Sequence, residues 1–447
     1  MPLRRHPLRQ RQRGVGTLIV TLMLLFAGSL AALYVNRGVL SEQRTSGNQM
    51  QATLAHEVAE AALEWATGML NSPFDIGTDC NFLTTTNASF RKRYVLTNWN
   101  APTPSSDVAP ATNVFPGCKT DPATGATTCN CPAVPAAGVV AVAALGGAVQ
   151  PSFTIAFQAV AGDPESVQVT AWACSAQAAT CTHRNDQAGF FESADGNVRL
   201  STTLKLRPLL RAMPSSPLTC GTSCTVGGSF NIVNQDVPTN GILVNAGTTI
   251  STAPGTTTTT LQGQPAANAL VGNDASLSAL SSTDPTCENS QMFNAYFGTT
   301  IEKYKDAPST KVLSCGSAAD CKSKIDSAYN DGWRAFYFNS DLHLSGNNTF
   351  GTQADPITLV TPNAIDINGN NVFYGLIFSN SADWNDIGTG SAIIRGAQVT
   401  CAAYNSNGNG TLDYDPDALK NVRRFTGVMV RVPGSWRDFR TNVDTLP

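Results

Sequence analysis

Cysteines are the residues of this sequence best suited to covalent chemistry. There are 12 of them, and all lie between Cys80 and Cys401. An even number of clustered cysteines, beginning only after an apolar N-terminal segment, is typical of disulfides formed in an oxidising compartment. Close spacing makes three local pairs the candidates: Cys174 with Cys181, Cys220 with Cys224, and Cys315 with Cys321. The remaining connectivity is left open by the sequence.

A calcium loop is the second candidate for chemistry. Four oxygen-bearing side chains stand at ligand positions of an EF-hand-like loop: Asn405, Asn407, Asn409 and Asp413. Three of these side chains are neutral, and the twelfth position is Pro416 instead of glutamate. A plain Asn/Gly-rich turn explains the same residues. No cofactor is firmly predicted, and calcium is the one candidate.

Catalytic motifs are missing from the sequence. His56-Glu57 begins like the zinc-protease motif H-E-x-x-H, but the fifth residue is Glu60. There is no G-x-S-x-G, P-loop or G-x-G-x-x-G signature. Acidic residues outnumber basic ones by 32 to 29, and five of the arginines lie in the first 14 residues. The rest of the chain is therefore acidic, which excludes a nucleic-acid partner, and we expect no enzyme.

The N-terminal segment determines where the rest of the chain is held. Residues 15–35 carry no charge and follow five arginines, so a helix there would span a bilayer with its start in the cytoplasm. No proline interrupts residues 8–72, and one apolar stripe continues the helix to residue 72. The stripe is made of Met50, Leu54, Val58, Ala61, Ala62, Trp65 and Met69. An unprocessed single-pass periplasmic protein with a helical stalk would show the same pattern.

Local motifs make this helix more specific. Arg13-Gly14-Val15 resembles the leader junction of type IV prepilins, which implies peptidase cleavage between Gly14 and Val15. Residues 40–44, 47–48 and 59–63 (L-S-E-Q-R, G-N and A-E-A-A-L) resemble the N-terminal region of PilX-type minor pilins. Residues 373–378, 394–397 and 433–439 are similar to the closing part of long PilX-like pilus assembly proteins.

The resemblance implies that the helix carries the assembly contacts. The positions concerned are Thr17, Leu18, Ile19, Leu22, Glu42, Arg44 and Glu60. In major pilins, the residue five places after the cleavage point is a glutamate that pairs with the N-terminal amine of a neighbouring subunit. Here that residue is Ile19. A subunit without the acid is a poor repeating unit, which favours a place in a tip or initiation complex.

Patterns further along predict an α+β fold: the long helix on an antiparallel sheet, as in a pilin roll, with a large β-rich, disulfide-bonded head. Strands are expected at 153–160, 167–174 and 198–206. In the head we expect helices at about 290–305 and 318–330, and strands at 334–338, 357–360, 372–378, 392–399 and 426–430. A β-sandwich and a solenoid both fit residues 211–285. The expected divisions are 1–14 (leader), 15–35 (transmembrane half of the helix), 36–72 (amphipathic half), 73–210 (pilin-like body) and 211–447 (head).

The function implied by the resemblance is type IV pilus assembly, with a role in twitching motility and cell adhesion. Its partners would be other minor pilins, the major pilin, a tip adhesin, the prepilin peptidase, the inner-membrane assembly platform and membrane lipid. The body would lie in the periplasm until the subunit enters a surface pilus. A tip pseudopilin of a type II secretion system is the alternative with the same topology.

Overall fold

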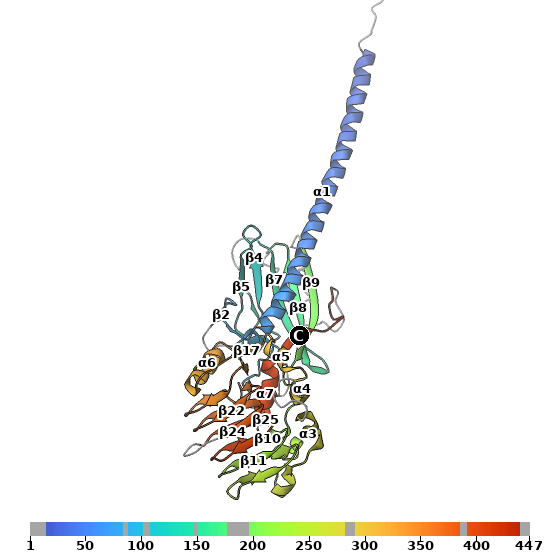
Figure 1. Ribbon diagram of the computed structural model, residues 1–447. Coiled ribbons are helices and arrows are strands. Elements are labelled where there is room, and N and C mark those ends of the chain that lie inside the picture. Colours follow the sequence, from blue (N-terminus) through green and yellow to red (C-terminus); the bar gives the residue numbers. More distant parts are fainter. Residues whose placement is uncertain are drawn as a thin grey trace, which may run out of the picture.

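The computed structural model consists of one long helix, α1 (Val15–Asn71), a body built around its C-terminal half, and a head at the far end of the body (Figure 1). It describes residues 15–83, 88–101, 108–145, 150–176, 196–281, 291–384 and 391–438. The expected leader, residues 1–14, lies outside the described residues, as do Gly14 and Cys181.

The C-terminal half of α1 packs against the body through small side chains. The buried positions recur every three or four residues: Ala55, Ala59, Ala62, Leu63, Ala66, Met69 and Leu70. Alanines on this face let the helix approach the sheet closely. The buried stripe is therefore rotated from the predicted one, because Met50 is 66% exposed and Ala61 is exposed as well.

The body is a six-stranded antiparallel sheet, with α1 on one face. Its order is β28-β9-β8-β7-β4-β5. The bounds are β4 (Gly117–Thr120), β5 (Thr127–Asn130), β7 (Ser152–Val160), β8 (Asp163–Cys174), β9 (Asn197–Arg207) and β28 (Val428–Arg431). The predicted α+β class is confirmed, and β7, β8 and β9 coincide with the three expected strands. Their apolar residues form one core with α1 and with helix α2 (Phe90–Tyr94).

Two short pairings complete the body. An antiparallel pair is formed by β1 (Asp75–Ile76) and β2 (Phe82–Leu83), and a parallel pair by β3 (Val114–Phe115) and β6 (Ala141–Val142).

The last body strand corrects the expected domain boundary. β28 pairs antiparallel with β9, with Val428 opposite Arg207. The segment from Val428 onward was assigned to the head, but it completes the body sheet instead. The head is therefore an insertion between β9 and β28. Both ends of the insertion are fixed in neighbouring strands, so they leave and re-enter the body side by side.

The head is a parallel β-solenoid, which rules out the sandwich alternative. Every strand pairing recorded among its described residues is parallel. The first face stacks β17 (Thr310–Leu313), β18 (Ala335–Phe338), β21 (Ile357–Val360), β23 (Val372–Ser379), β25 (Ile393–Thr400), β10 (Leu218–Cys220), β13 (Val244–Ala246) and β16 (Leu270–Val271). The second face consists of the stacked strands β19 (Leu342–Leu344), β22 (Ala364–Ile367), β24 (Ser381–Trp384), β26 (Tyr404–Ser406), β11 (Cys224–Val226) and β14 (Ile250–Thr252).

The third face contains β20 (Thr349–Phe350), the first halves of β23 and β25, β27 (Thr411–Asp413), β12 (Asn231–Val233) and β15 (Thr257–Thr259). Strands β23 and β25 turn from this face to the first without a break, at Gly375 and Gly396. These glycines pair with each other and have φ values of 128° and 136°, which only glycine adopts readily.

Coils of the solenoid do not stack in sequence order. The coil β10-β11-β12 lies on the coil β25-β26-β27, so Leu218 pairs with Gln398. The coil β13-β14-β15 follows β10-β11-β12 and forms the end of the head that is farthest from the body (Figure 1). Inward-facing apolar side chains stack through the coils: Phe350, Phe373, Ile394, Leu412 and Ile232.

Helices cover the first face of the solenoid. These are α3 (Ala275–Ser281), α4 (Gln291–Phe297), α5 (Ile301–Lys305) and α7 (Pro416–Thr426), which share a second core with the outward side chains of that face. The helix expected at 290–305 is divided where Gly298 has φ 65° and Thr300 caps α5. The predicted helix at 318–330 is α6 (Ala318–Asn330). Two 3-10 turns, η1 (Val237–Thr239) and η2 (Ala266–Ala269), lie in the loops.

Candidate assembly helix and its anchoring to the body

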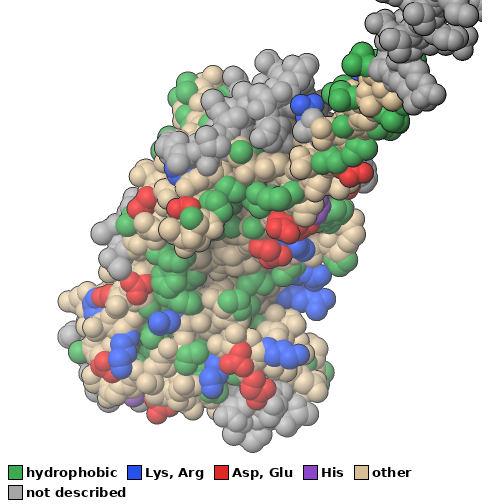
Figure 2. Space-filling view, turned by 90° about the horizontal axis from the view of Figure 1, so that it is seen from above, with side chains coloured by type: hydrophobic (Ala, Val, Ile, Leu, Met, Phe, Trp, Pro, Cys, Tyr) green, Lys and Arg blue, Asp and Glu red, His purple; other side chains and the backbone are tan. Residues whose placement is uncertain are grey.

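The N-terminal half of α1 stands free of the body. Every apolar side chain described between residues 18 and 39 is exposed, and Leu25 and Tyr34 reach 74% and 84%. The helix is long and apolar enough to cross a membrane, by length and composition. Figure 2, which looks from the helix end, shows hydrophobic side chains along the part of α1 that leaves the body. An apolar surface of this size needs lipid or partner helices around it.

The predicted assembly positions divide into two groups. Thr17, Leu18, Ile19 and Leu22 are exposed on the free half, and so are Glu42 and Arg44 further along it. Glu60 differs, because its Oε1 accepts a hydrogen bond of 2.7 Å from Trp436 Nε1. Glu60 therefore contacts its own body, and its role in assembly stays a prediction. Gly14 cannot be placed, and α1 begins at Val15.

The C-terminal half of α1 is tied to the last body strand by side chains. The Asn71 amide donates to Met429 O at 2.9 Å and its Oδ1 accepts from Met429 N at 2.7 Å. Arg431 Nη2 lies 3.0 Å from the Glu64 carboxylate. Because β28 follows the inserted head directly, these contacts fix the exit of the head on the same helix that carries the free apolar half.

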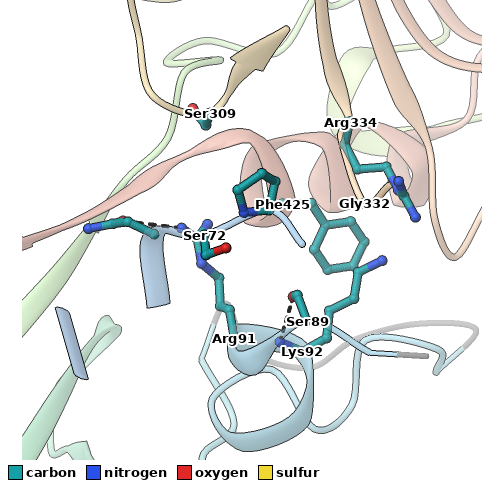
Figure 3. Close-up of a pocket in the computed structure, with 10 residues that line it drawn as sticks. Ser72, Ser89, Arg91, Lys92, Ser309, Gly332, Arg334 and Phe425 are labelled. Atoms are coloured by element: carbon teal, nitrogen blue, oxygen red, sulfur yellow. Dashed lines mark hydrogen bonds between the residues drawn. The ribbon is translucent and has the colours of Figure 1, made fainter. Parts of the chain in front are cut away.

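Buried charges join the body to the head, and Figure 3 shows two of the residues concerned, Lys92 and Arg334. Lys92 of α2 and Arg334, just before β18, both bind Asp355, with Lys92 Nζ, Arg334 Nε and Arg334 Nη2 each 2.6 Å from a carboxylate oxygen. Burial by itself would raise the pKa of Asp355, but the two cations lower it to about 2. Burial lowers the pKa of Lys92 to about 8, against the attraction of Asp355. The cluster is therefore ionised between those values, and it fixes the head on the body.

Arg91 of α2 adds two hydrogen bonds at the same junction, close to the end of α1. Its Nε donates to Leu70 O at 2.7 Å, and its Nη1 donates to Gly427 O at 2.6 Å. The first contact satisfies a carbonyl in the last turn of α1, which has no partner within the helix. The second holds the residue where the chain leaves the head for β28. Burial lowers the pKa of Arg91 to about 10, so it stays charged at neutral pH.

Disulfides cross-link segments within both the head and the body. In the head, Cys220 is bonded to Cys224 and Cys315 to Cys321, which are two of the three local pairs expected from the sequence. In the body, Cys80 is bonded to Cys131 and Cys118 to Cys129, pairings that the sequence left open. Cys174 is disulfide-bonded as well. Its expected partner, Cys181, lies outside the described residues.

The calcium candidate has a different explanation in the structure. Asn405 lies on β26, Asn407 and Asn409 in the following turn, and Asp413 ends β27. Backbone carbonyls of this loop accept hydrogen bonds from the neighbouring coil: Gly227 N to Ser406 O, and Asn231 N to Gly410 O. The loop is therefore stacked along the solenoid instead of wrapped around a cation. Within the described residues no group of three or more His, Cys, Asp or Glu side chains could hold a metal ion. Calcium binding is not supported.

Signals for the solenoid were present in the sequence but were missed. The segments S-G-N-N-T-F at 345–350 and N-G-N-N-V-F at 368–373 stack directly, with Phe350 opposite Phe373. Their turns are linked by asparagines: Asn370 Nδ2 donates to Asn347 Oδ1 at 2.9 Å. A comparison of turn motifs, with the intervening lengths left free, would have found this repeat. Asp415-Pro416 was also an unused helix-start signal for α7, where Asp415 is the N-cap.

A free apolar helix continuing into an antiparallel sheet is the architecture of a pilin-like subunit. In agreement, residues 13–64 match the family model described as PilX N-terminal. These residues are thus a PilX-type N-terminal segment, and the resemblance seen in the sequence is confirmed there. The match covers α1 as far as Glu64 and does not extend to the body or the head.

Comparisons over longer stretches are weaker. A competence-associated pilin, ComZ from Thermus thermophilus, has 11% identity and a TM-score of 0.23, covering 87% of this chain and 97% of that one. An ice binding protein from an Antarctic Biological Consortium has 14% identity and a TM-score of 0.21, covering 46% and 91%. Scores this low carry no argument about fold or function. Curated proteins yield no match for this chain.

Proposed function

We propose that this protein is a minor pilin that takes part in type IV pilus assembly, within a tip or initiation complex. The observation that carries the proposal is a PilX-type segment folded as a helix whose apolar half is exposed while its other half is packed into a body. A helix of this kind can lie in the inner membrane and later pack among other helices, because both surroundings are apolar.

Each part of the chain has a role in this mechanism. Cleavage after Gly14 releases the leader, and the assembly platform extracts the helix from the membrane. Thr17, Leu18 and Leu22 then pack against helices of other minor pilins and the major pilin. The body stays rigid during extraction because its sheet and its disulfides hold it together, and the Asp355 cluster keeps the head fixed on it. The role is assembly and presentation, with no catalytic step.

A place at the tip is supported by two features. Ile19 occupies the position where a repeating subunit needs an acid, and its side chain is 50% exposed. The head extends away from the helix, beyond the body (Figure 1). A head of more than 200 residues between β9 and β28 is easily accommodated at a filament end, next to a tip adhesin, and poorly in a closely packed shaft.

The test compares Gly14→Ala with Gly16→Ala, a matched change two residues away where an added Cβ meets nothing within 4 Å. Immunogold labelling of native filaments should show the unsubstituted protein and Gly16→Ala at filament ends. Gly14→Ala should remain in the membrane and reduce the number of pili. Labelling along the shaft would reject the tip assignment. Normal piliation and filament entry of Gly14→Ala would reject the minor-pilin proposal.

A further inference from the structure

The two ends of the solenoid are closed differently. At the end near the body, α6 buries Cys321, Ile325 and Ala328 in the solenoid core. At the far end, η2 and β16 are the described elements that cover the last coil, and β16 pairs with β13 of the first face. The second and third faces therefore end in β14 and β15, which are edge strands of their stacks.

The backbone of these edge strands has one side turned away from the solenoid. Thr249 O accepts a hydrogen bond from Cys224 N, and Ala253 N donates one to Val226 O. The backbone N–H and C=O groups of the residues in between therefore point alternately towards β11 and away from it. Ser251 faces β11, and the N–H and C=O groups of Ile250 and Thr252 point outward. In β15, Thr257 N and Thr259 O bond to the neighbouring coil in the same way, so the backbone groups of Thr258 point outward.

Strands β14 and β15 themselves carry none of the usual protection against edge pairing. Folded proteins prevent the edge strands of their sheets from pairing with other chains by means of lysines, prolines, bulges or covering segments. Neither β14 (Ile250–Thr252) nor β15 (Thr257–Thr259) contains a charge or a proline. The sequence has no lysine or arginine between Arg211 and Lys303. An open, uncharged edge of this kind is an aggregation hazard unless something occupies it.

A shallow hollow runs beside the edge of β14. It is lined by Ile250 and Thr252 of β14 and by Leu270, Gly272 and Asn273, among others. Ile250 and Leu270 are both partly buried against the solenoid core, and most of the exposed lining of the hollow is polar. No described residue that lines the hollow is charged, so it suits a segment that pairs with backbone groups and has uncharged side chains.

We propose that the β14–β15 end of the head binds an extended, uncharged segment of a partner protein, which adds a strand to the solenoid. Only a polypeptide backbone offers donors and acceptors at the spacing of the edge, and parallel pairing would continue the stack β26-β11-β14 by one more strand. The end concerned is the part of the head farthest from α1, where a partner at a filament tip would be met. The inference rests on the proposed function only in assuming that the head is exported.

The experiment places a photoreactive amino acid at Ser251 of the full chain in piliated cells. The same group at His343, exposed at the other end of the second face, is the positional control. We expect an adduct from position 251 to an uncharged, strand-forming peptide of a different protein, and none to that peptide from position 343.

Backbone dependence is tested by a matched pair of changes. Thr252→Pro removes the outward N–H and should lower the adduct about tenfold, the loss expected for a hydrogen bond and a steric conflict. Thr252→Val keeps the N–H and should leave the adduct within twofold. Thr258→Lys, on the other edge strand, should lower it as well. Unchanged thermal unfolding of each variant shows that the fold is intact.

Three results would overturn the inference: no adduct at 251, an adduct that Thr252→Pro leaves unchanged, or an adduct to residues of a second copy of this chain. The N-terminus of the crosslinked chain is read in the same digest. A cleaved chain without an adduct rejects this inference and leaves the minor-pilin proposal standing. An adduct on a chain that retains its leader supports the inference and rejects that proposal.

Discussion

Trp436 donates a hydrogen bond from its indole nitrogen to the carboxylate of Glu60, across 376 residues of sequence. The ring also lies 6.1 Å from that of His56 on the same helix. The segment after β28 thus returns to the helix that begins the fold. Together with Asn71 and Arg431, this contact makes the junction of head, body and α1 one continuous unit.

Ile19→Glu tests the tip assignment. The change restores the acid found in repeating pilins at an exposed position of α1, where it meets no packing in the isolated chain. If the subunit has nothing above it in the filament, the new carboxylate has no amine to pair with, and the number of pili should not rise. A clear gain in piliation, counted by electron microscopy, would contradict a tip position.

Asp355→Asn should loosen the head from the body. It leaves Lys92 and Arg334 buried with reduced compensation, which typically costs roughly 3–5 kcal/mol. Chemical denaturation of the full chain in detergent measures the effect. Asp320→Asn, which removes an exposed pair with Lys324, is the control and should cost about 0.5 kcal/mol or less. Equal effects of the two changes would show that the buried cluster has no special role.

The same cluster predicts an acid sensitivity. The pKa of Asp355 is lowered from 3.8 to about 2, so its contribution of roughly 2 kcal/mol is present above pH 3.8 and is lost as the pH falls towards 2. The protection of backbone amides near Lys92 and Arg334 against hydrogen exchange, relative to their intrinsic exchange rates, should fall over that range in the native protein. In Asp355→Asn this loss of protection should be absent. An identical acid profile in both proteins would contradict the assignment.

The disulfides should differ in their contribution to stability. Cys80–Cys131 closes 51 residues and Cys220–Cys224 closes four. Chain-entropy estimates give about 4 kcal/mol for the first and about 2 kcal/mol for the second. Paired serine substitutions, compared by thermal unfolding under the same conditions, should therefore destabilise the body more than the head. The reverse order would show that strain or packing dominates over loop closure.

Gly375→Ala should disrupt the solenoid. A Cβ there would lie 2.0 Å from Ile357 O, at a φ of 128° that other residues rarely adopt. We expect a loss of about 3 kcal/mol or more, seen as a lower unfolding midpoint. Gly316→Ala, where nothing lies within 4 Å, is the control and should change little. Tolerance of both changes would contradict the strand turn described at Gly375.

Local sequence patterns predicted the helices and strands whose formation depends on residues close to them in the chain. β7, β8 and β9 were found because hairpin strands alternate apolar side chains between turns, and α6 because its start and end signals are local. The solenoid remained one of two alternatives for residues 211–285 and was not expected beyond them, because its stacking pairs Leu218 with Gln398, which no local pattern reveals. The contact of Glu60 with Trp436 was not predicted for a similar reason, since the two residues are distant in sequence.

Mass spectrometry of the native N-terminus, on protein from sheared filaments and from membranes, tests the central claim most directly. The proposal predicts a chain that begins at Val15 and is present at trace level in the filaments. A chain that retains the arginines of residues 1–14 and is absent from filaments would contradict it, leaving an unprocessed single-pass periplasmic protein.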